Sequence, residues 1–110
     1  MFHNILLFQD YDLSKLSEKE WVAVAYENNK YFVGQVEKIN DDDVQVNFLY
    51  KASINDYFYW PQVQDKAIVE PNVIFYPHVK VFQAGRKFRV HDLKEIVTTF
   101  EQFSKKYFNN

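Results

Sequence analysis

Short segments rich in β-branched and aromatic residues run through residues 21–76, and polar turn signals separate them. The segments are WVAVAY (21–26), YFVGQVEKI (31–39), VQVNFLY (44–50), KAIV (66–69) and VIFY (73–76). Several short strands at close spacing are typical of a small antiparallel barrel or sandwich. Gly34 lies inside the second segment, where a glycine indicates a bulge or a sharp bend. The sequence therefore predicts a small, mainly β domain.

The last third of the chain has a different pattern. HVKVF and RKFRV flank QAG, which predicts either a hairpin with Gly85 in its turn or an irregular loop. Asp92 and Glu95 then have the spacing of a capping box at the start of a helix. Apolar residues recur at helical spacing after this point; they are Leu93, Ile96, Val97, Phe100, Phe103 and Tyr107. This stripe either packs on the β domain or forms a dimer or partner surface.

These patterns divide the chain into three parts. Residues 1–19 are an N-terminal extension, residues 20–77 form the β domain, and residues 78–110 hold the hairpin or loop and the helix. A chain of 110 residues can bury one hydrophobic core but not two. We therefore expect one compact domain with an appended helix.

Several kinds of chemistry lack the residues they need. The chain has no cysteine, which excludes disulfides and thiolate metal sites and fits an intracellular protein. We expect neither a secretory leader nor a membrane span, because the longest apolar run is far below the ~20 residues that a span needs. His3, His78 and His91 lack metal-site spacing, and the acidic run at 41–43 lacks the other ligands of an EF-hand. We expect no metal, no cofactor and no catalysis.

Charge is distributed unevenly, although the net charge is only −2. Residues 21–77 carry four lysines against eight acidic residues, whereas residues 78–110 carry seven basic residues against three acidic ones. The basic part supplies candidate phosphate contacts for nucleic acid; these are Arg86, Lys87, Arg89, Lys105 and Lys106. The acidic body argues against a broad nucleic-acid footprint, so we rank a protein or peptide partner first.

Phe, Tyr and Trp make up 19% of the chain, more than a core of this size needs. Four aromatic residues are consecutive in NDYFYWPQ (55–62). Alternation along a strand predicts that Tyr57 and Tyr59 share one face and that Phe58 and Trp60 share the other. We expect Phe58 and Trp60 to plug the β domain and the two tyrosines, whose hydroxyls tolerate water, to form a contact surface.

The segment WVAVAYENNKYFVGQVEKINDDDVQVNFLY resembles the Tudor-like, SH3-like barrel superfamily. YFYWPQVQDKAIVEPNVIF is similar to the end of barrel modules found beside transposase-derived domains, in which an aromatic-Trp-Pro step, an Asp a few residues later and a short strand close the barrel. The likeness covers about residues 20–76. It implies a mainly β fold, namely a five-stranded SH3-like (Tudor-like) barrel, to which the C-terminal amphipathic α-helix is added.

The resemblance also implies where an aromatic cage would lie. The cage aromatics of the first three strands fall on Tyr26, Phe32 and Phe48, with Gly34 as the small residue that follows the second of them. Further candidates are the rings of Tyr50, Tyr57 and Tyr59 and, as the polar residue that closes the cage, Asn55 or Asp56. Such cages bind methylated ammonium groups.

The resemblance therefore implies a non-enzymatic interaction module that recognises a peptide or protein partner. A methylated Lys or Arg in a chromatin or RNA-silencing setting is the expected ligand, and the nucleus is the expected location rather than the cytoplasm. Two alternatives remain open. One is nucleic-acid binding through the basic C-terminal segment, and the other is a structural or oligomerisation module that dimerises through the helix stripe.

Overall fold

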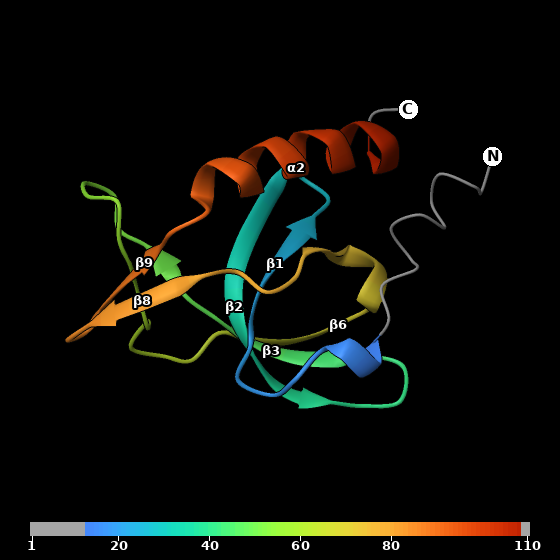
Figure 1. Ribbon diagram of the computed structural model, residues 1–110, viewed down its shortest axis with the longest axis horizontal. Coiled ribbons are helices and arrows are strands. Elements are labelled where there is room, and N and C mark those ends of the chain that lie inside the picture. Colours follow the sequence, from blue (N-terminus) through green and yellow to red (C-terminus); the bar gives the residue numbers. More distant parts are fainter. Residues whose placement is uncertain (1–12, 109–110) are drawn as a thin grey trace.

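The structure, a computed structural model, describes residues 13–108, so residues 1–12 of the predicted extension lie outside the described residues. This part of the chain forms nine strands in two antiparallel sheets and one α-helix (Figure 1). The predicted mainly β fold with a C-terminal helix is confirmed. The elements are the 3-10 helix η1 (Leu13–Lys15), β1 (Trp21–Tyr26), β2 (Lys30–Ile39), β3 (Val44–Phe48), β4 (Tyr50–Lys51), β5 (Phe58–Tyr59), β6 (Lys66–Val69), the 3-10 helix η2 (Pro71–Val73), β7 (Ile74–Tyr76), β8 (Val81–Ala84), β9 (Lys87–Val90) and α2 (Leu93–Tyr107).

A five-stranded sheet holds the segments whose composition predicts strands. Its order is β6-β3-β2-β1-β7. The long strand β2 pairs with β1 on one side and with β3 on the other, and its register with β3 shifts between Val36 and Lys38, as in a bulge that bends a strand. β6 and β7 are the edges of this sheet. Within residues 13–108 they do not pair with each other, so hydrogen bonding does not close the sheet.

A second, four-stranded sheet has the order β4-β5-β9-β8. It joins two short strands from the middle of the chain to the β8–β9 hairpin. Gly85 lies in the hairpin turn at a φ of 64°, a conformation that a residue without a Cβ adopts easily. Phe58 of β5 lies directly opposite Phe88 of β9. A strand far along the chain, β9, therefore pairs with the aromatic run of residues 57–60 and holds it in place.

Alternation along this aromatic run is only partly as predicted. Phe58 is buried and Tyr59 is 37% exposed. Trp60 is also 37% exposed, so the prediction that its ring plugs the core is wrong. The physical reason is that β5 contains only Phe58 and Tyr59, so Trp60 lies beyond the strand. Its ring stacks instead on Trp21, with ring centroids 5.7 Å apart.

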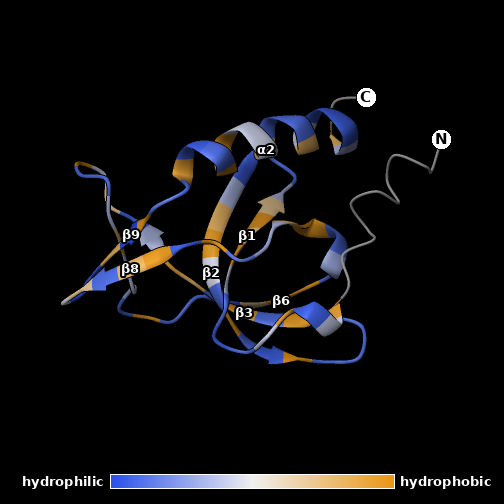
Figure 2. Ribbon diagram, viewed as in Figure 1, coloured by the Kyte–Doolittle hydropathy of each residue, from blue (hydrophilic) through white to orange (hydrophobic). Residues whose placement is uncertain are grey.

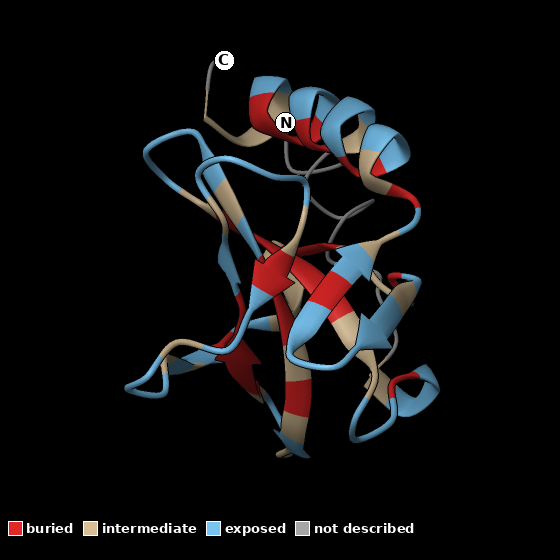
Figure 3. Cartoon of the chain, turned by 90° about the vertical axis from the view of Figure 1, so that its left-hand side faces the viewer, coloured by how far each residue is buried: buried red, intermediate tan, exposed pale blue. Residues whose placement is uncertain are grey.

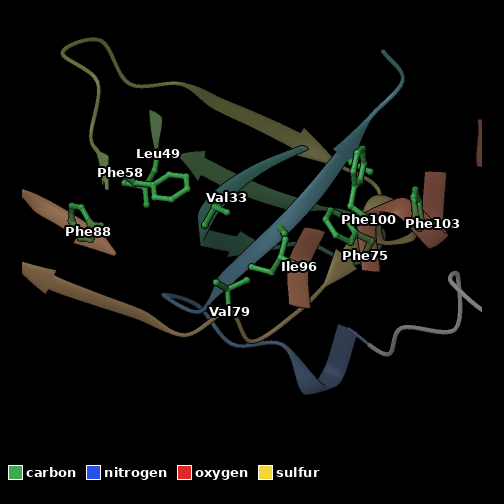
Figure 4. Packing of buried hydrophobic residues seen from close by; sticks show 11 residues of the cluster. Val33, Leu49, Phe58, Phe75, Val79, Phe88, Ile96, Phe100 and Phe103 are labelled. Carbon is green, nitrogen blue, oxygen red and sulfur yellow. The ribbon is translucent and has the colours of Figure 1, made fainter. Parts of the chain in front are cut away.

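Hydrophobic cores lie on both faces of the five-stranded sheet, so the prediction of a single core is wrong. The two cores fit in a chain of this length because they share the strands between them. One core consists of Leu16, Val22, Val24, Val36, Val44, Val46, Phe48, Val69 and Ile74. The other core involves both sheets and α2 and consists of Ala23, Ala25, Val33, Leu49, Phe58, Phe75, Val79, Phe88, Ile96, Phe100 and Phe103 (Figure 4). Alternate residues of β1 go to the two cores, which explains why residues 22–25 form an unbroken apolar run. Figure 2 shows hydrophobic residues along β1 and β2.

The helix α2 has the bounds of the predicted apolar stripe, Leu93–Tyr107. Ile96, Phe100 and Phe103 are buried in the core that includes β1 and β7, while Val97 is 40% exposed. The stripe thus packs on the β-strands of its own chain. No helix in the described part of the chain is both long enough and apolar enough to cross a bilayer.

The start of α2 differs from the predicted capping box. Asp92 is the N-cap residue, but its side chain makes no capping hydrogen bond. Its carboxylate accepts a hydrogen bond from the backbone N–H of Lys80 at 3.2 Å. Asp92 also acts on Tyr76. Burial is the main cause that raises the pKa of Tyr76, and a hydrogen bond to the Asp92 carboxylate and the charge of that carboxylate raise it further. Asp92 therefore ties the helix start to the segment before β8.

Candidate functional site

Three of the predicted cage rings lie on one face of the five-stranded sheet. Tyr26 ends β1, Phe32 is near the start of β2, and Phe48 ends β3. Antiparallel pairing sets Phe32 opposite Val24 and Gly34 opposite Phe48. Opposed residues point to the same side, as do residues two apart in a strand, so the three rings share a face. We call Tyr26, Phe32 and Phe48 the aromatic trio.

The rings of the aromatic trio pack edge to face. The ring centroids of Tyr26 and Phe32 are 5.1 Å apart, with the ring planes at 86°. The Phe48 ring lies 6.1 Å from each of the others, at 70° to Tyr26 and 67° to Phe32. Phe48 is 2% exposed, whereas Phe32 is 39% exposed. The aromatic trio therefore has a buried floor and an exposed outer ring.

Acidic residues lie around Tyr26. Burial, and after it the charge of the Asp65 carboxylate, raise the pKa of Tyr26 above its ordinary 10.0. The main-chain carbonyl of Asp65 accepts a hydrogen bond from the Phe48 N–H at 2.8 Å, which ties this residue to the aromatic trio. Tyr26 also lines a hollow of about 700 Å³ whose walls include Glu27 and Glu70. A cation in this hollow would meet the Tyr26 ring and carboxylates together.

Asp56, the predicted acidic residue of the cage, has its contacts elsewhere. Its carboxylate lies 3.9 Å from the Lys51 ammonium, and its main-chain carbonyl accepts a hydrogen bond from the Arg89 guanidinium at 3.1 Å. Both partners belong to the four-stranded sheet. The acidic residue whose charge acts on Tyr26 is Asp65, which sequence reasoning assigned to the closure of the expected barrel and not to the cage. Its signal was nevertheless present, because Asp65 is the Asp that follows the aromatic-Trp-Pro step.

The remaining candidate rings form a second cluster on the four-stranded sheet. The ring centroid of Tyr59 lies 6.2 Å from that of Tyr50 and 6.4 Å from that of Tyr57. The Lys87 ammonium lies 4.8 Å from the centroid of the Tyr57 ring. We call Tyr50, Tyr57 and Tyr59 the tyrosine cluster. Phe32 and Tyr50 both line a hollow of about 510 Å³, where the two groups of rings approach each other.

The five basic residues proposed as phosphate contacts are divided between two places. Arg86, Lys87 and Arg89 belong to the β8–β9 hairpin, whereas Lys105 and Lys106 lie in the last turn of α2. The hairpin and the end of α2 lie toward opposite ends of the molecule (Figure 1). Any nucleic-acid footprint would therefore use one of the two groups.

Within residues 13–108, no three histidine or acidic side chains gather in a way that could hold a metal ion.

No family model matches the chain, and comparison with curated proteins and with solved structures gives no significant match.

Proposed function

We propose that this chain is a non-enzymatic interaction module in which the aromatic trio binds a methylated Lys or Arg side chain of a peptide or protein partner. The near-perpendicular packing of the three rings carries the proposal, and the negative charge of Asp65, which acts on Tyr26, supports it. A methylated ammonium group hydrogen-bonds poorly to water and is attracted to ring faces by roughly 0.5–2 kcal/mol per contact. The exposed ring of Phe32 gives such a group a point of entry.

The charge around the aromatic trio also supports a basic partner. Residues 21–77 carry twice as many acidic as basic residues, and Glu27 and Glu70 line the hollow next to Tyr26. A negative surface raises the rate at which a basic segment associates with it. A basic peptide is therefore attracted before its methylated side chain meets the rings.

We also propose that the five-stranded sheet is an SH3-like (Tudor-like) barrel. Each of its strands contributes to one shared core, as strands around a barrel interior do; the contributing residues include Val22, Val36, Val46, Val69 and Ile74. The bend in β2 supports the same architecture, because bulges are common at the rims of barrels. Because residues 20–76 resemble such modules, the partner that we propose is a methylated protein of a chromatin or RNA-silencing pathway, in the nucleus.

Peptides that carry trimethyl-lysine, dimethyl-arginine or the unmodified residues test this proposal. We expect a methylated peptide to shift the ring resonances of Tyr26, Phe32 and Phe48 in NMR spectra of the labelled protein. F32A removes an exposed ring, so we expect the fold to persist and the Kd to rise about tenfold, as loss of one such contact implies. F82A is the matched control, because Phe82 is 63% exposed on the four-stranded sheet. Unchanged spectra with every peptide would contradict the methyl-binding proposal.

A further inference from the structure

The four-stranded sheet has one buried and one exposed face. Phe58 and Phe88 lie opposite each other and are only 5% and 3% exposed. Their neighbours in the strands, Tyr59, Lys87 and Arg89, therefore point to the other face. In Figure 3, the side of the molecule that carries β8 and β9 faces the viewer, and most of the residues of these two strands are exposed. We call this exposed side the outer face.

Tyrosine rings and cationic side chains lie next to each other on the outer face. Tyr50 and Tyr59 are paired across β4 and β5 and are 43% and 37% exposed. Tyr57 and Tyr59 line a hollow of about 380 Å³ together with Arg86 and Lys87. A ligand in this hollow would meet flat apolar surface and positive charge at the same time.

The outer face is also basic on balance. Arg86, Lys87 and Arg89 bring three positive charges, and Asp56, whose main-chain carbonyl accepts a hydrogen bond from Arg89, brings a negative one. Lys51 lies opposite Phe58 and therefore points to the other face of the sheet. The contact between Asp56 and Lys51 joins two well-exposed side chains at 3.9 Å, so it holds neither side chain firmly. This charge is opposite in sign to that around Tyr26. The two sites therefore suit ligands of different chemistry.

We infer that the outer face binds single-stranded nucleic acid, with bases stacked on the tyrosine cluster and phosphates held by Arg86, Lys87 and Arg89. Unpaired bases offer free π faces, which stack on aromatic side chains whatever the base. A duplex keeps its bases stacked on each other and would use the cations alone. An acidic peptide would likewise use the cations and leave the rings unused. The inference does not depend on the ligand of the aromatic trio, which lies on the other sheet.

Fluorescence anisotropy with the full chain and a dye-labelled oligo-dT or oligo-U of about 12 nucleotides tests this inference, since sites of this kind cover roughly 4–16 nucleotides. We expect binding at ~50 mM salt that weakens steeply toward ~200 mM. The double variant K87Q/R89Q should weaken binding and lower the slope of log K against log salt by about 0.7 for each lost phosphate contact. Y59L keeps an apolar side chain without a ring and should weaken binding about tenfold.

The double variant K15Q/K38Q is the matched control, because it removes the same charge from exposed positions in η1 and β2, away from the outer face. We expect it to bind nearly as well as the parent chain. An equal loss in this control, equal affinity for a duplex of the same length, or unchanged affinity of Y59L would each overturn the inference. Absence of binding at ~50 mM salt would overturn it as well. If K87Q/R89Q loses nucleic-acid binding but still binds a methylated peptide, the two sites are independent, and failure of one proposal does not imply failure of the other.

Discussion

Gly34 lies directly opposite Phe48, and the ring of Phe48 occupies the space that a side chain at position 34 would need. An added Cβ would lie 2.9 Å from the Phe48 ring and 2.5 Å from a methyl carbon of Val46. The floor of the aromatic trio therefore depends on glycine at this position. Both neighbours are buried, so neither can move away easily.

We expect G34A to lower the free energy of unfolding by about 1–3 kcal/mol, the range for an overpacked core. Urea unfolding measures this change. V46A removes the methyl carbon that lies closest to the added Cβ. The double variant G34A/V46A should therefore lose less free energy of unfolding than the sum of the losses in G34A and V46A. Strictly additive effects of the two changes would contradict this account of Gly34.

The stripe of α2 yields a second prediction, on stability. Phe103 is fully buried, and its ring centroid lies 5.8 Å from that of Phe75 in β7. F103A should cost about 3–5 kcal/mol, as deletion of a buried ring usually does. Val97 lies in the same helix but is 40% exposed, so V97A should change stability by about 0.5 kcal/mol or less. Thermal unfolding followed by circular dichroism compares the two, and similar costs would show that the stripe is not core.

Asp65 yields a third prediction, on the ionisation of Tyr26. Burial is the larger cause of the raised Tyr26 pKa, and the Asp65 charge is the second cause. D65N removes this charge, so the Tyr26 pKa should move part of the way back toward 10.0. D56N removes a carboxylate from the other sheet and should leave the titration of Tyr26 unchanged. NMR titration of the Tyr26 ring measures the pKa in the two variants. An equal change of the Tyr26 pKa in D65N and D56N would contradict the effect that we assign to Asp65.

Four partly buried tyrosines predict how stability depends on pH. Burial is the main cause of a raised pKa at Tyr26, Tyr31, Tyr76 and Tyr107. The folded chain therefore keeps protons that the unfolded chain loses near pH 10.0. This contribution to stability is fully present below the unfolded pKa and is lost as the pH rises through the folded values.

We therefore expect the free energy of unfolding to fall as the pH rises above 10.0. Y31F removes one contributor, so its fall between about pH 8 and about pH 11 should be shallower than that of the parent chain. Urea unfolding at the two pH values measures the difference. Parallel falls in the two chains would show that Tyr31 does not contribute.

Local patterns in the sequence predict most of the individual elements. The helical spacing of apolar residues from Leu93 to Tyr107 matches the bounds of α2, because that spacing depends on the residues of the helix alone. The segments predicted as strands become the five-stranded sheet for a similar reason. The resemblance places Tyr26, Phe32 and Phe48 at equivalent cage positions, and the strand register brings their rings together.

Contacts between distant segments determine the rest. Phe58 is buried because Phe88, from a strand far along the chain, lies opposite it, whereas Trp60 lies beyond the end of β5 and stays partly exposed. The pairing of β4 with β5 also places Tyr50 and Tyr59 on a different sheet from the aromatic trio. Asp65 is held at Phe48, where its charge acts on Tyr26, because β6 returns beside β3. Sequence alone thus determined the strands of the five-stranded sheet and the helix, because propensity and periodicity are local. Only the tertiary structure decided which rings and charges meet, because strand pairing joins residues that no local pattern connects.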